Sequence, residues 1–269
     1  QIYKKMKVMV VGEFCWPWYQ EIFSEALKKN NCDVSKFSWF DYFYRWEQGK
    51  SEPVYKSIVH KIQYRLRKGP IINDISKNLL RECIANKPDV IFFYNVLLIP
   101  PKIILEIKKA LPQTQLCQYA NDDPFAKDAK FFLWNHFLNS IKYFDKHFAY
   151  RESNIQEFHK YGAKKVDLLR SYFIPEEDYP MDQSQIEDQF KCDVLFAGHY
   201  EDDSRVEFLE SIMDSGYSLN LFGGGWNAAL PKLRKDSPLK SKFPISPVTG
   251  DDYRQAICGS KLALCFLSK

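Results

Sequence analysis

Residues 7–12, KVMVVG, set the fold class of this chain. They form a short apolar, β-branched run that ends in glycine, and a helical pattern follows after a loop, in residues 19–31 (YQEIFSEALKKNN). Strand, loop and helix in this order are how an α/β domain begins. The run VIFFY at residues 90–94 is almost continuously apolar, which is typical of a strand covered on both faces.

This alternation continues along the chain. Strand patterns recur at residues 32–40, 115–120, 143–150 and 164–169, and helical patterns lie at about 54–67, from 73, at 101–110 and at 152–162. Repeated strand and helix units of this kind predict a parallel, doubly wound sheet.

The alternation stops after residue 172, in a stretch with prolines and many acidic residues that indicates a linker. The opening pattern then returns at residues 191–198 (KCDVLFAG). We therefore predict a first α/β domain over residues 1–175, a linker over 176–190 and a second α/β domain over 191–269. Three predicted strands in ~80 residues make about half of a doubly wound domain, so the second domain is expected to be incomplete.

Composition and charge argue against nucleic-acid binding. The chain has 269 residues and a formal net charge of +4, and its charged residues are interspersed. The best candidate for a basic surface, residues 60–69 (HKIQYRLRKG), fits a solvated helix face at least as well. An affinity of this run for anionic lipid head groups is the more modest alternative.

The cysteines and histidines predict neither disulfides nor a metal site. The seven cysteines are dispersed with no C-x-x-C pair, and the five histidines are scattered as well. Dispersed thiols in apolar surroundings are typical of a cytosolic protein, and no run approaches ~18 uninterrupted apolar residues. We predict a cytoplasmic protein, peripheral to the inner face of the membrane if the basic run contacts lipid.

Three loops are predicted at the carboxyl ends of strands, where open α/β sheets bind their ligands. The first follows the opening strand and carries Glu13, Trp16 and Trp18. Aromatic faces beside a carboxylate suit a hydroxyl-rich ligand such as a sugar. The equally weighted alternative is that the two tryptophans cap the core.

The second loop is Asn121, Asp122, Asp123 and Pro124. An aspartate before proline and a helical run is a good helix cap, which explains one of the two carboxylates. It explains neither the second nor the asparagine, so a polar site in which one aspartate acts as general base is favoured.

The third candidate is a pair of glycine loops in the second domain. Gly198 precedes a helix that contains Arg205, so backbone N–H groups and a guanidinium there suit a phosphate; His199 follows Gly198 and lies within reach of the same ligand. The other loop is FGGGWN at residues 222–227. Neither loop has a dinucleotide or P-loop fingerprint, and many glycine turns merely reverse the chain.

Several segments together resemble a known family. The segments NDDPF (121–125), DVLFAGHYEDDSR (193–205), LNLFGGGW (219–226) and DDYRQAICGSKLALCFLS (251–268) occur in the order seen in the spore-maturation-type glycosyltransferases. These are GT-B proteins similar to the retaining group-4 enzymes. Their order and spacing carry the resemblance, which runs from about Lys7 to Lys269. The family's region after CFLS, with an Arg-x-Phe-Glu-type helix and a donor-binding glutamate, is missing here.

The resemblance implies two Rossmann-like domains facing one another across a cleft, with the acceptor on the first and a UDP- or GDP-linked sugar on the second. It implies a metal-independent, retaining transferase without a resident cofactor. In that family's pattern Gly198, Tyr200 and Arg205 would stabilise the diphosphate, and Ser260 with Lys261 would lie near the base and ribose. The donor would also be bordered by Gly223, Gly224, Gly225 and Trp226.

The function expected from these residues is transfer of a sugar to a saccharide, lipid-linked or protein acceptor. Glu13, Asp122 and Asp123 would face the acceptor, together with Trp16, Trp18 and Asn121. The alternative is a non-catalytic GT-B-like module that binds a glycan or a partner protein, which the short second domain favours. A small-molecule-binding regulator is a third reading that nothing in the sequence demands.

Overall fold

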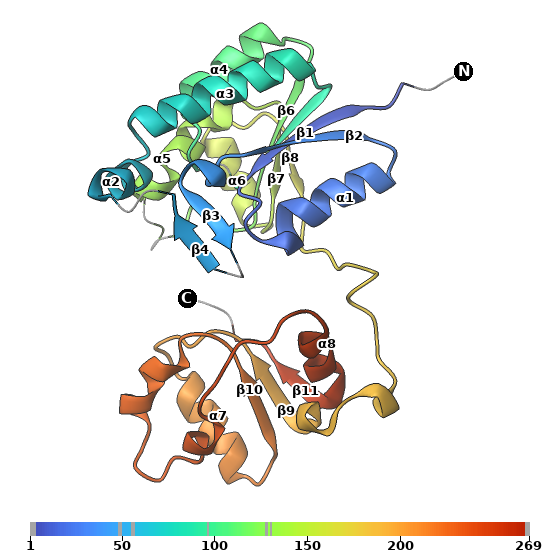
Figure 1. Ribbon diagram of the computed structural model, residues 1–269, viewed down its shortest axis with the longest axis vertical. Helices are drawn as coiled ribbons and strands as arrows, with labels where there is room; N and C mark the ends of the chain where they lie inside the picture. Colours follow the sequence, from blue (N-terminus) through green and yellow to red (C-terminus); the bar gives the residue numbers. More distant parts are fainter. Residues whose placement is uncertain are drawn as a thin grey trace. The chain divides into compact units, whose positions relative to one another are not determined.

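The computed structural model describes residues 4–47, 50–54, 57–95, 97–126, 129 and 131–266. The chain divides into two compact units, Gln1–Tyr172 and Phe173–Lys269 (Figure 1). Each unit contains a parallel sheet with helices, so the predicted α/β class is confirmed.

The first unit is built on a six-stranded sheet in the order β2-β1-β5-β6-β7-β8. Every neighbouring pair in it is parallel. Its strands are β1 (Lys7–Gly12), β2 (Asp33–Ser38), β5 (Val90–Tyr94), β6 (Gln115–Ala120), β7 (Lys146–Ala149) and β8 (Val166–Leu168). Its helices are α1 (Ile22–Lys29), α2 (Ile58–Leu66), α3 (Pro70–Asn86), α4 (Pro101–Ala110), α5 (Phe131–Ser140) and α6 (Asn154–Lys160).

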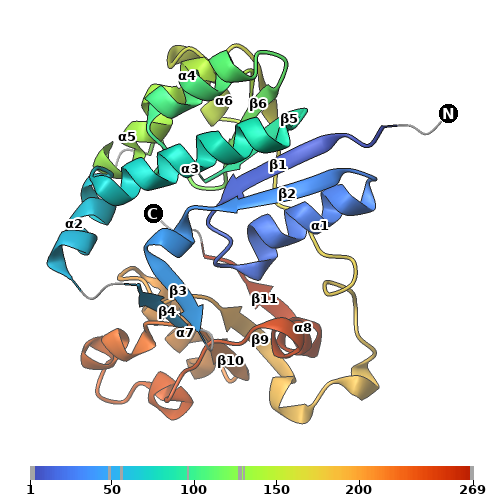
Figure 2. The same ribbon diagram turned by 45° about the horizontal axis from the view of Figure 1, so that its top comes forward.

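The central strands are buried on both faces, as the apolar runs predict. On one face Met9 and Val11 of β1 pack with residues of α3 and α4, such as Ile75 and Ile104. On the other face Phe92 and Tyr94 of β5 and Tyr119 of β6 pack with Phe23 of α1. Figure 2 shows α3 and α1 on either side of β1.

The chain order creates a switch point in this sheet. After β2 the chain crosses over β1 and continues in β5 on its other side. The loops after β1 and β5 therefore leave the sheet in opposite directions, and the space outside these carboxyl ends is where open α/β sheets bind ligands.

The region around residues 44–66 differs from the predicted helix at 54–67. An antiparallel hairpin, β3 (Tyr44–Glu47) with β4 (Lys50–Pro53), precedes a shorter α2. The helix begins after Ser57 because that hydroxyl accepts a hydrogen bond from the His60 N–H at 3.2 Å, as an N-cap does.

The second unit has a three-stranded parallel sheet in the order β10-β9-β11. Its elements are β9 (Cys192–Ala197), α7 (Arg205–Asp214), β10 (Leu219–Phe222), α8 (Gly250–Gly259) and β11 (Ser260–Leu264). Trp226 and Leu209 lie in its core. Ile186 and Phe190, at the end of the predicted linker, are buried against Leu195 and Ala256, because their apolar side chains cover the second face of the sheet.

No helix within the described ranges is both long and apolar enough to cross a membrane.

A buried histidine makes the first unit sensitive to acid. His147 of β7 is fully buried, its Nε2 donates to the Ile141 carbonyl at 2.9 Å, and its Nδ1 has no hydrogen-bond partner. Burial lowers the pKa of His147 from 6.5 to about 4. Between these values the unfolded chain binds a proton that the folded chain does not, so stability falls as the pH falls.

We expect the free energy of unfolding to drop by up to about 3 kcal/mol through this residue as the pH falls from about 6.5 to about 4. The measurement is urea unfolding of the full chain across this range. A His147→Gln variant, which keeps an N–H donor but does not titrate, should show a shallower pH dependence. Equal slopes in the two proteins would contradict the assignment.

Candidate functional site

Glu13 lies directly after β1, at the switch point, and its environment raises the pKa of its carboxyl group. Burial is the main cause. A hydrogen bond from the Cys15 thiol at 3.3 Å opposes it, the charge of Asp122 adds to it, and the charge of Arg67 opposes it. A carboxyl group with a raised pKa at a ligand-binding edge has the properties of a general acid or base.

Arg67 is a member of this site that the sequence did not indicate. It ends α2 with a φ of 57° and is only 5% exposed. Its guanidinium lies 4.4 Å from the Tyr64 ring centroid and donates to the Tyr64 carbonyl at 2.7 Å, while its Nε has no hydrogen-bond partner. The Arg67 carbonyl accepts from His136 at 2.9 Å. Arg67 was expected on a solvated helix face, but it is a buried cation near Glu13.

The two tryptophans of the first loop form an exposed pair. The rings of Trp16 and Trp18 stack with centroids 5.1 Å apart, and the residues are 40% and 41% exposed. They therefore do not fill the core. Tyr172 holds the loop in place because its hydroxyl donates to the Trp18 carbonyl at 2.8 Å. Stacked, solvent-exposed aromatic rings offer a flat apolar surface to a ligand.

Asn121 connects the ends of two neighbouring strands. Its Oδ1 accepts from Asn95 Nδ2 at 2.5 Å, and its N–H donates to Asn95 Oδ1 at 3.3 Å. Asn95 follows β5 in a left-handed conformation with a φ of 51°, which asparagine tolerates. This reciprocal pair orders the loops on which Asp122 and Asp123 sit.

The adjacent aspartates have different surroundings. Asp123 Oδ1 accepts from the Phe125 N–H at 2.9 Å and from Asn154 Nδ2 at 3.0 Å, so it closes the turn and connects it to α6. Asp122 is exposed, although partial desolvation of its carboxyl group raises its pKa and Arg151 lowers it. Asp123 is placed as a structural residue, and Asp122 stands on the same side as Glu13.

This difference predicts unequal effects of the two aspartates on stability. Asp123→Ala should lower the free energy of unfolding by about 1–2 kcal/mol, because two hydrogen bonds to partly buried donors are lost. Asp122→Ala should change it by less than about 0.5 kcal/mol, as expected for an exposed side chain. Urea unfolding midpoints of the two variants measure this, and an equal loss in both would refute the division of roles.

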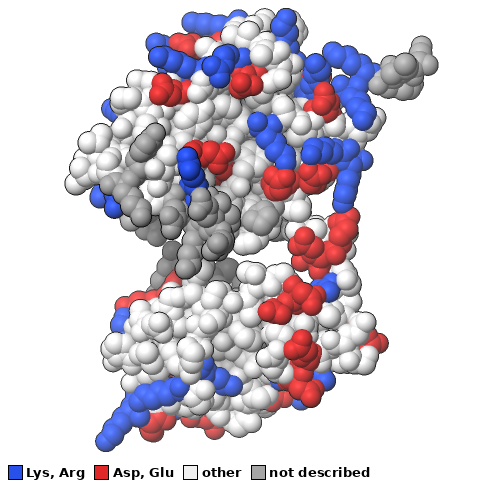
Figure 3. Space-filling view, viewed as in Figure 1, with Lys and Arg blue, Asp and Glu red and all other residues white. Residues whose placement is uncertain are grey.

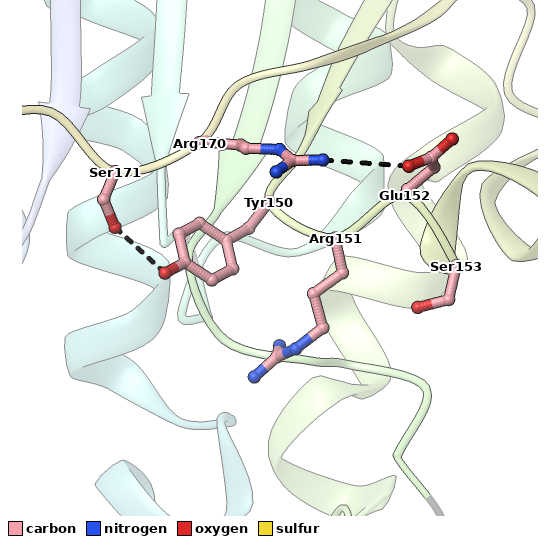
Figure 4. A pocket seen from close by; sticks show the side chains of 6 residues that line it. All are labelled: Tyr150, Arg151, Glu152, Ser153, Arg170 and Ser171. Carbon is pink, nitrogen blue, oxygen red and sulfur yellow. Dashed lines mark hydrogen bonds and ion pairs between the residues drawn. The ribbon is translucent and has the colours of Figure 1, made fainter. Parts of the chain in front are cut away.

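A pocket of about 520 Å³ lies beyond the ends of β7 and β8 (Figure 4). The Tyr150 hydroxyl and Ser171 Oγ are 2.9 Å apart, and Arg170 lies 3.7 Å from Glu152. Its lining residues are Tyr150, Arg151, Glu152, Ser153, Arg170 and Ser171. None of these belonged to the predicted site, because their two segments meet only in the folded sheet.

In the second unit the two glycine loops pack directly on one another. Tyr200 N–H donates to the Gly224 carbonyl at 2.9 Å, and Trp226 Nε1 donates to the Gly198 carbonyl at 3.0 Å. Gly223 has a φ of 148°, and a Cβ there would lie 1.8 Å from the Gly198 oxygen. A Cβ at Gly224 would lie 3.2 Å from His199 Nδ1. The close approach of the loops therefore requires glycine.

Arg205 is buried beneath these loops and is only 3% exposed. Its Nε and Nη2 donate to Asp203 at 2.8 and 2.9 Å, Nη2 also lies 3.1 Å from Glu201, and Nη1 donates to the His199 carbonyl. With its charge neutralised and its donors engaged, Arg205 holds the loop rather than presenting a free cation.

The remaining predicted donor residues lie at the opposite end of the strands, where β9 and β11 begin. Ser260 and Lys261 begin β11 and are paired with the first residues of β9, whereas Gly198 and Gly223 follow the ends of β9 and β10. Lys261 forms an ion pair with Asp193 at 2.7 Å, beside a separate pocket of about 580 Å³. The structure therefore brings Gly198–Tyr200 together with Gly223–Trp226 but does not bring Ser260 and Lys261 to them.

The contact between the glycine loops can be tested by substitution. Gly223→Ala should lower stability by at least about 2 kcal/mol, because the methyl group overlaps the Gly198 carbonyl in a strained backbone. Gly216→Ala is the matched control, since Gly216 also has a positive φ of 85° but nothing lies within 4 Å of its Cβ position. That variant should lose only about 1 kcal/mol. Thermal unfolding compares them, and equal losses would rule out the contact.

Among the residues that the structure describes, no group of potential metal ligands points to an additional site. Within the described part of the chain, no three His, Cys, Asp or Glu side chains are grouped so that they could hold a metal ion. On the face drawn in Figure 3, basic and acidic side chains of the first unit are intermixed.

Comparisons with known proteins identify the fold. No protein-family model and no curated protein matches the chain. Among solved structures, a protein described as a UDP-N-acetylglucosamine 2-epimerase from Listeria monocytogenes matches with a TM-score of 0.56 and 12% identity, over 97% of this chain and 74% of that one. The UDP-GlcNAc 2-epimerase of Methanocaldococcus jannaschii matches with a TM-score of 0.57 and 13% identity, over 96% and 78%.

A third match is UGT73P12 of Glycyrrhiza uralensis in complex with glycyrrhetinic acid 3-O-monoglucuronide, with a TM-score of 0.52 and 8% identity, over 92% of this chain and 69% of that one. At these identities the likeness shows the fold alone. The chain has the α/β fold of the GT-B type.

Proposed function

We propose that this chain is a nucleotide-sugar-dependent glycosyltransferase. The observation that carries the proposal is the grouping, at the switch point of the first unit, of Glu13 with a raised pKa beside Asp122 and the exposed Trp16–Trp18 pair. A carboxylate and a stacking surface are what a sugar hydroxyl needs in order to be held and deprotonated. The GT-B fold is compatible with this chemistry but does not by itself imply it.

The proposed reaction places the acceptor on the first unit. Glu13 accepts the proton of the acceptor hydroxyl as that oxygen attacks the anomeric carbon of the donor sugar, and the bond to the nucleoside diphosphate breaks. Burial helps because a base with a pKa nearer neutrality takes the proton more readily. Asp122 raises the pKa of Glu13 further, and Arg67 limits the rise. Retention at the anomeric carbon is proposed from the resemblance alone, and it requires the acceptor oxygen to attack from the face that the departing diphosphate occupies.

The proposed donor site is the pair of packed glycine loops of the second unit. Backbone N–H groups and the Tyr200 ring would border a UDP- or GDP-linked sugar. Trp226, predicted to border the donor as well, is buried and instead packs against Tyr200, with ring centroids 5.6 Å apart. Arg205 supports this surface through the His199 carbonyl. We favour Ser260 and Lys261 less as donor-binding residues, because they begin β11 and lie at the end of the strands opposite to the glycine loops.

The seven free cysteines support a cytoplasmic location for this enzyme.

The alternative is a non-catalytic GT-B-like module that binds a glycan or a partner protein. It is favoured by the Trp16–Trp18 pair, which needs no neighbouring catalyst to hold a sugar. The structural hydrogen bonds of Asp123 fit it as well, because they leave fewer free carboxylates for chemistry.

The test combines donor binding with turnover. Thermal-shift measurements with UDP, GDP, CMP and ADP should show stabilisation by UDP or GDP, since a ligand that binds only the folded state raises the melting temperature. With the matching nucleotide sugar, Glu13→Gln should slow release of the nucleotide by about 10²–10⁴-fold while leaving the thermal shift unchanged. The control is Glu106→Gln, at a partly exposed residue of α4 that is paired with Lys102.

Each of the other outcomes of these measurements would support a different function or a different base. Saccharide binding without any nucleotide response would favour the non-catalytic module. Conversion of the sugar while it stays linked to the nucleotide would replace transfer by epimerisation. Full turnover by the Glu13→Gln variant would show that Glu13 is not the catalytic base.

A further inference from the structure

The pocket beyond β7 and β8 has the chemistry of an anion site. We propose that it binds an anionic group, a phosphate or a carboxylate, carried by the acceptor substrate. This inference rests on the proposed function, because it specifies the acceptor of that reaction. Two arginines enter the pocket from different segments, Arg151 after β7 and Arg170 after β8 (Figure 4).

Neither guanidinium is strongly held by the protein. Arg170 lies 3.7 Å from Glu152, and the two side chains are 69% and 78% exposed. An exposed pair at this distance contributes little to stability, so a ligand anion can take the place of Glu152. The Arg151 side chain makes no hydrogen bond or ion pair with another described residue, and its guanidinium lies 5.5 Å from the centroid of the Tyr150 ring.

Hydroxyl groups complete the set of donors. Tyr150 and Ser171 share one hydrogen bond of 2.9 Å in which either can be the donor, so one hydroxyl hydrogen is free to turn towards a ligand. Ser153 lines the opposite side of the pocket (Figure 4). Guanidinium groups with nearby hydroxyls match the oxygen atoms of phosphate and carboxylate, to which arginine binds in a bidentate manner.

The same geometry disfavours a neutral sugar in this pocket. Neutral sugars bind to open aromatic faces, as the Trp16–Trp18 pair offers. The only aromatic residue among the pocket's lining is Tyr150, and the Arg151 guanidinium lies over its ring. The pocket therefore presents charge, and the tryptophans present a stacking surface.

The pocket is also next to Asp122, whose charge acts in turn on the candidate base Glu13. Strand β7 is the neighbour of β6, so Arg151 and Asp122 follow adjacent strands, and their charges interact. An acceptor with its anionic group between Arg151 and Arg170 would direct the rest of the molecule along the sheet edge towards β6 and β1. The anion would then set the orientation in which a hydroxyl meets Asp122 and Glu13.

The test measures binding by the 269-residue chain without any donor. Glucose 6-phosphate, glucuronate, inorganic phosphate and glucose are titrated by isothermal calorimetry. We expect at least one anionic probe to bind at least tenfold more tightly than glucose. Comparing the affinities for phosphate and glucuronate shows whether the site prefers a phosphate or a carboxylate. Arg151→Gln and Arg170→Gln should each weaken that probe at least tenfold, whereas Arg81→Gln, an exposed arginine of α3, should not.

The proposal is overturned if no anionic probe binds, if glucose binds as tightly, or if the arginine variants bind the anion as the unmodified protein does. Circular dichroism of each variant excludes loss of the fold as the cause of weaker binding. Because binding is measured without a nucleotide sugar, anion binding with no turnover would refute the proposed transferase and leave the anion site intact. Turnover with no anion binding would support the transferase and refute the anion site.

Discussion

The structure depends on one constraint, which is that the central parallel strands are covered on both faces. Successive residues such as Val10 and Val11, or Phe92 and Phe93, are all buried although they point to opposite sides of the sheet. Polar groups without partners are costly in such surroundings. Charged side chains that are candidates for chemistry are therefore expected where the strands end, and Glu13, the aspartates and the two pocket arginines all lie there.

The same constraint explains which features the sequence could predict. Continuous apolar runs such as VIFFY in β5 mark a covered strand, and a glycine or polar residue marks its end. The α/β class and the positions of the loops at the strand ends could be predicted from these local signals. The exposure of Trp16 and Trp18 could not, because it depends on the segments that pack beside the loop.

The features that the sequence did not indicate depend on contacts that form only in the folded chain. Arg67 looked like part of a solvated helix face, yet the end of α2 turns it into the protein near Glu13. Arg205 looked like a phosphate ligand, yet Asp203 and Glu201, which lie just before it in the chain, neutralise it. Ser260 and Lys261 were grouped with the glycine loops by resemblance, but the strand direction of β11 separates them. Residues distant in sequence decide the role of Arg67, near neighbours in the chain decide that of Arg205, and strand direction decides that of Ser260 and Lys261.

Tyr172 has a consequence for how the chain could respond to force. It is the last residue of the first unit, and its hydroxyl donates to the backbone carbonyls of Trp18 and Tyr19 at 2.8 and 3.1 Å. The segment that begins at Phe173 is thus tethered to the loop that carries the tryptophans. Tension on that segment would reach the loop directly through the Tyr172 hydroxyl, so the segment that begins at Phe173 is also a mechanical connection to the exposed aromatic pair.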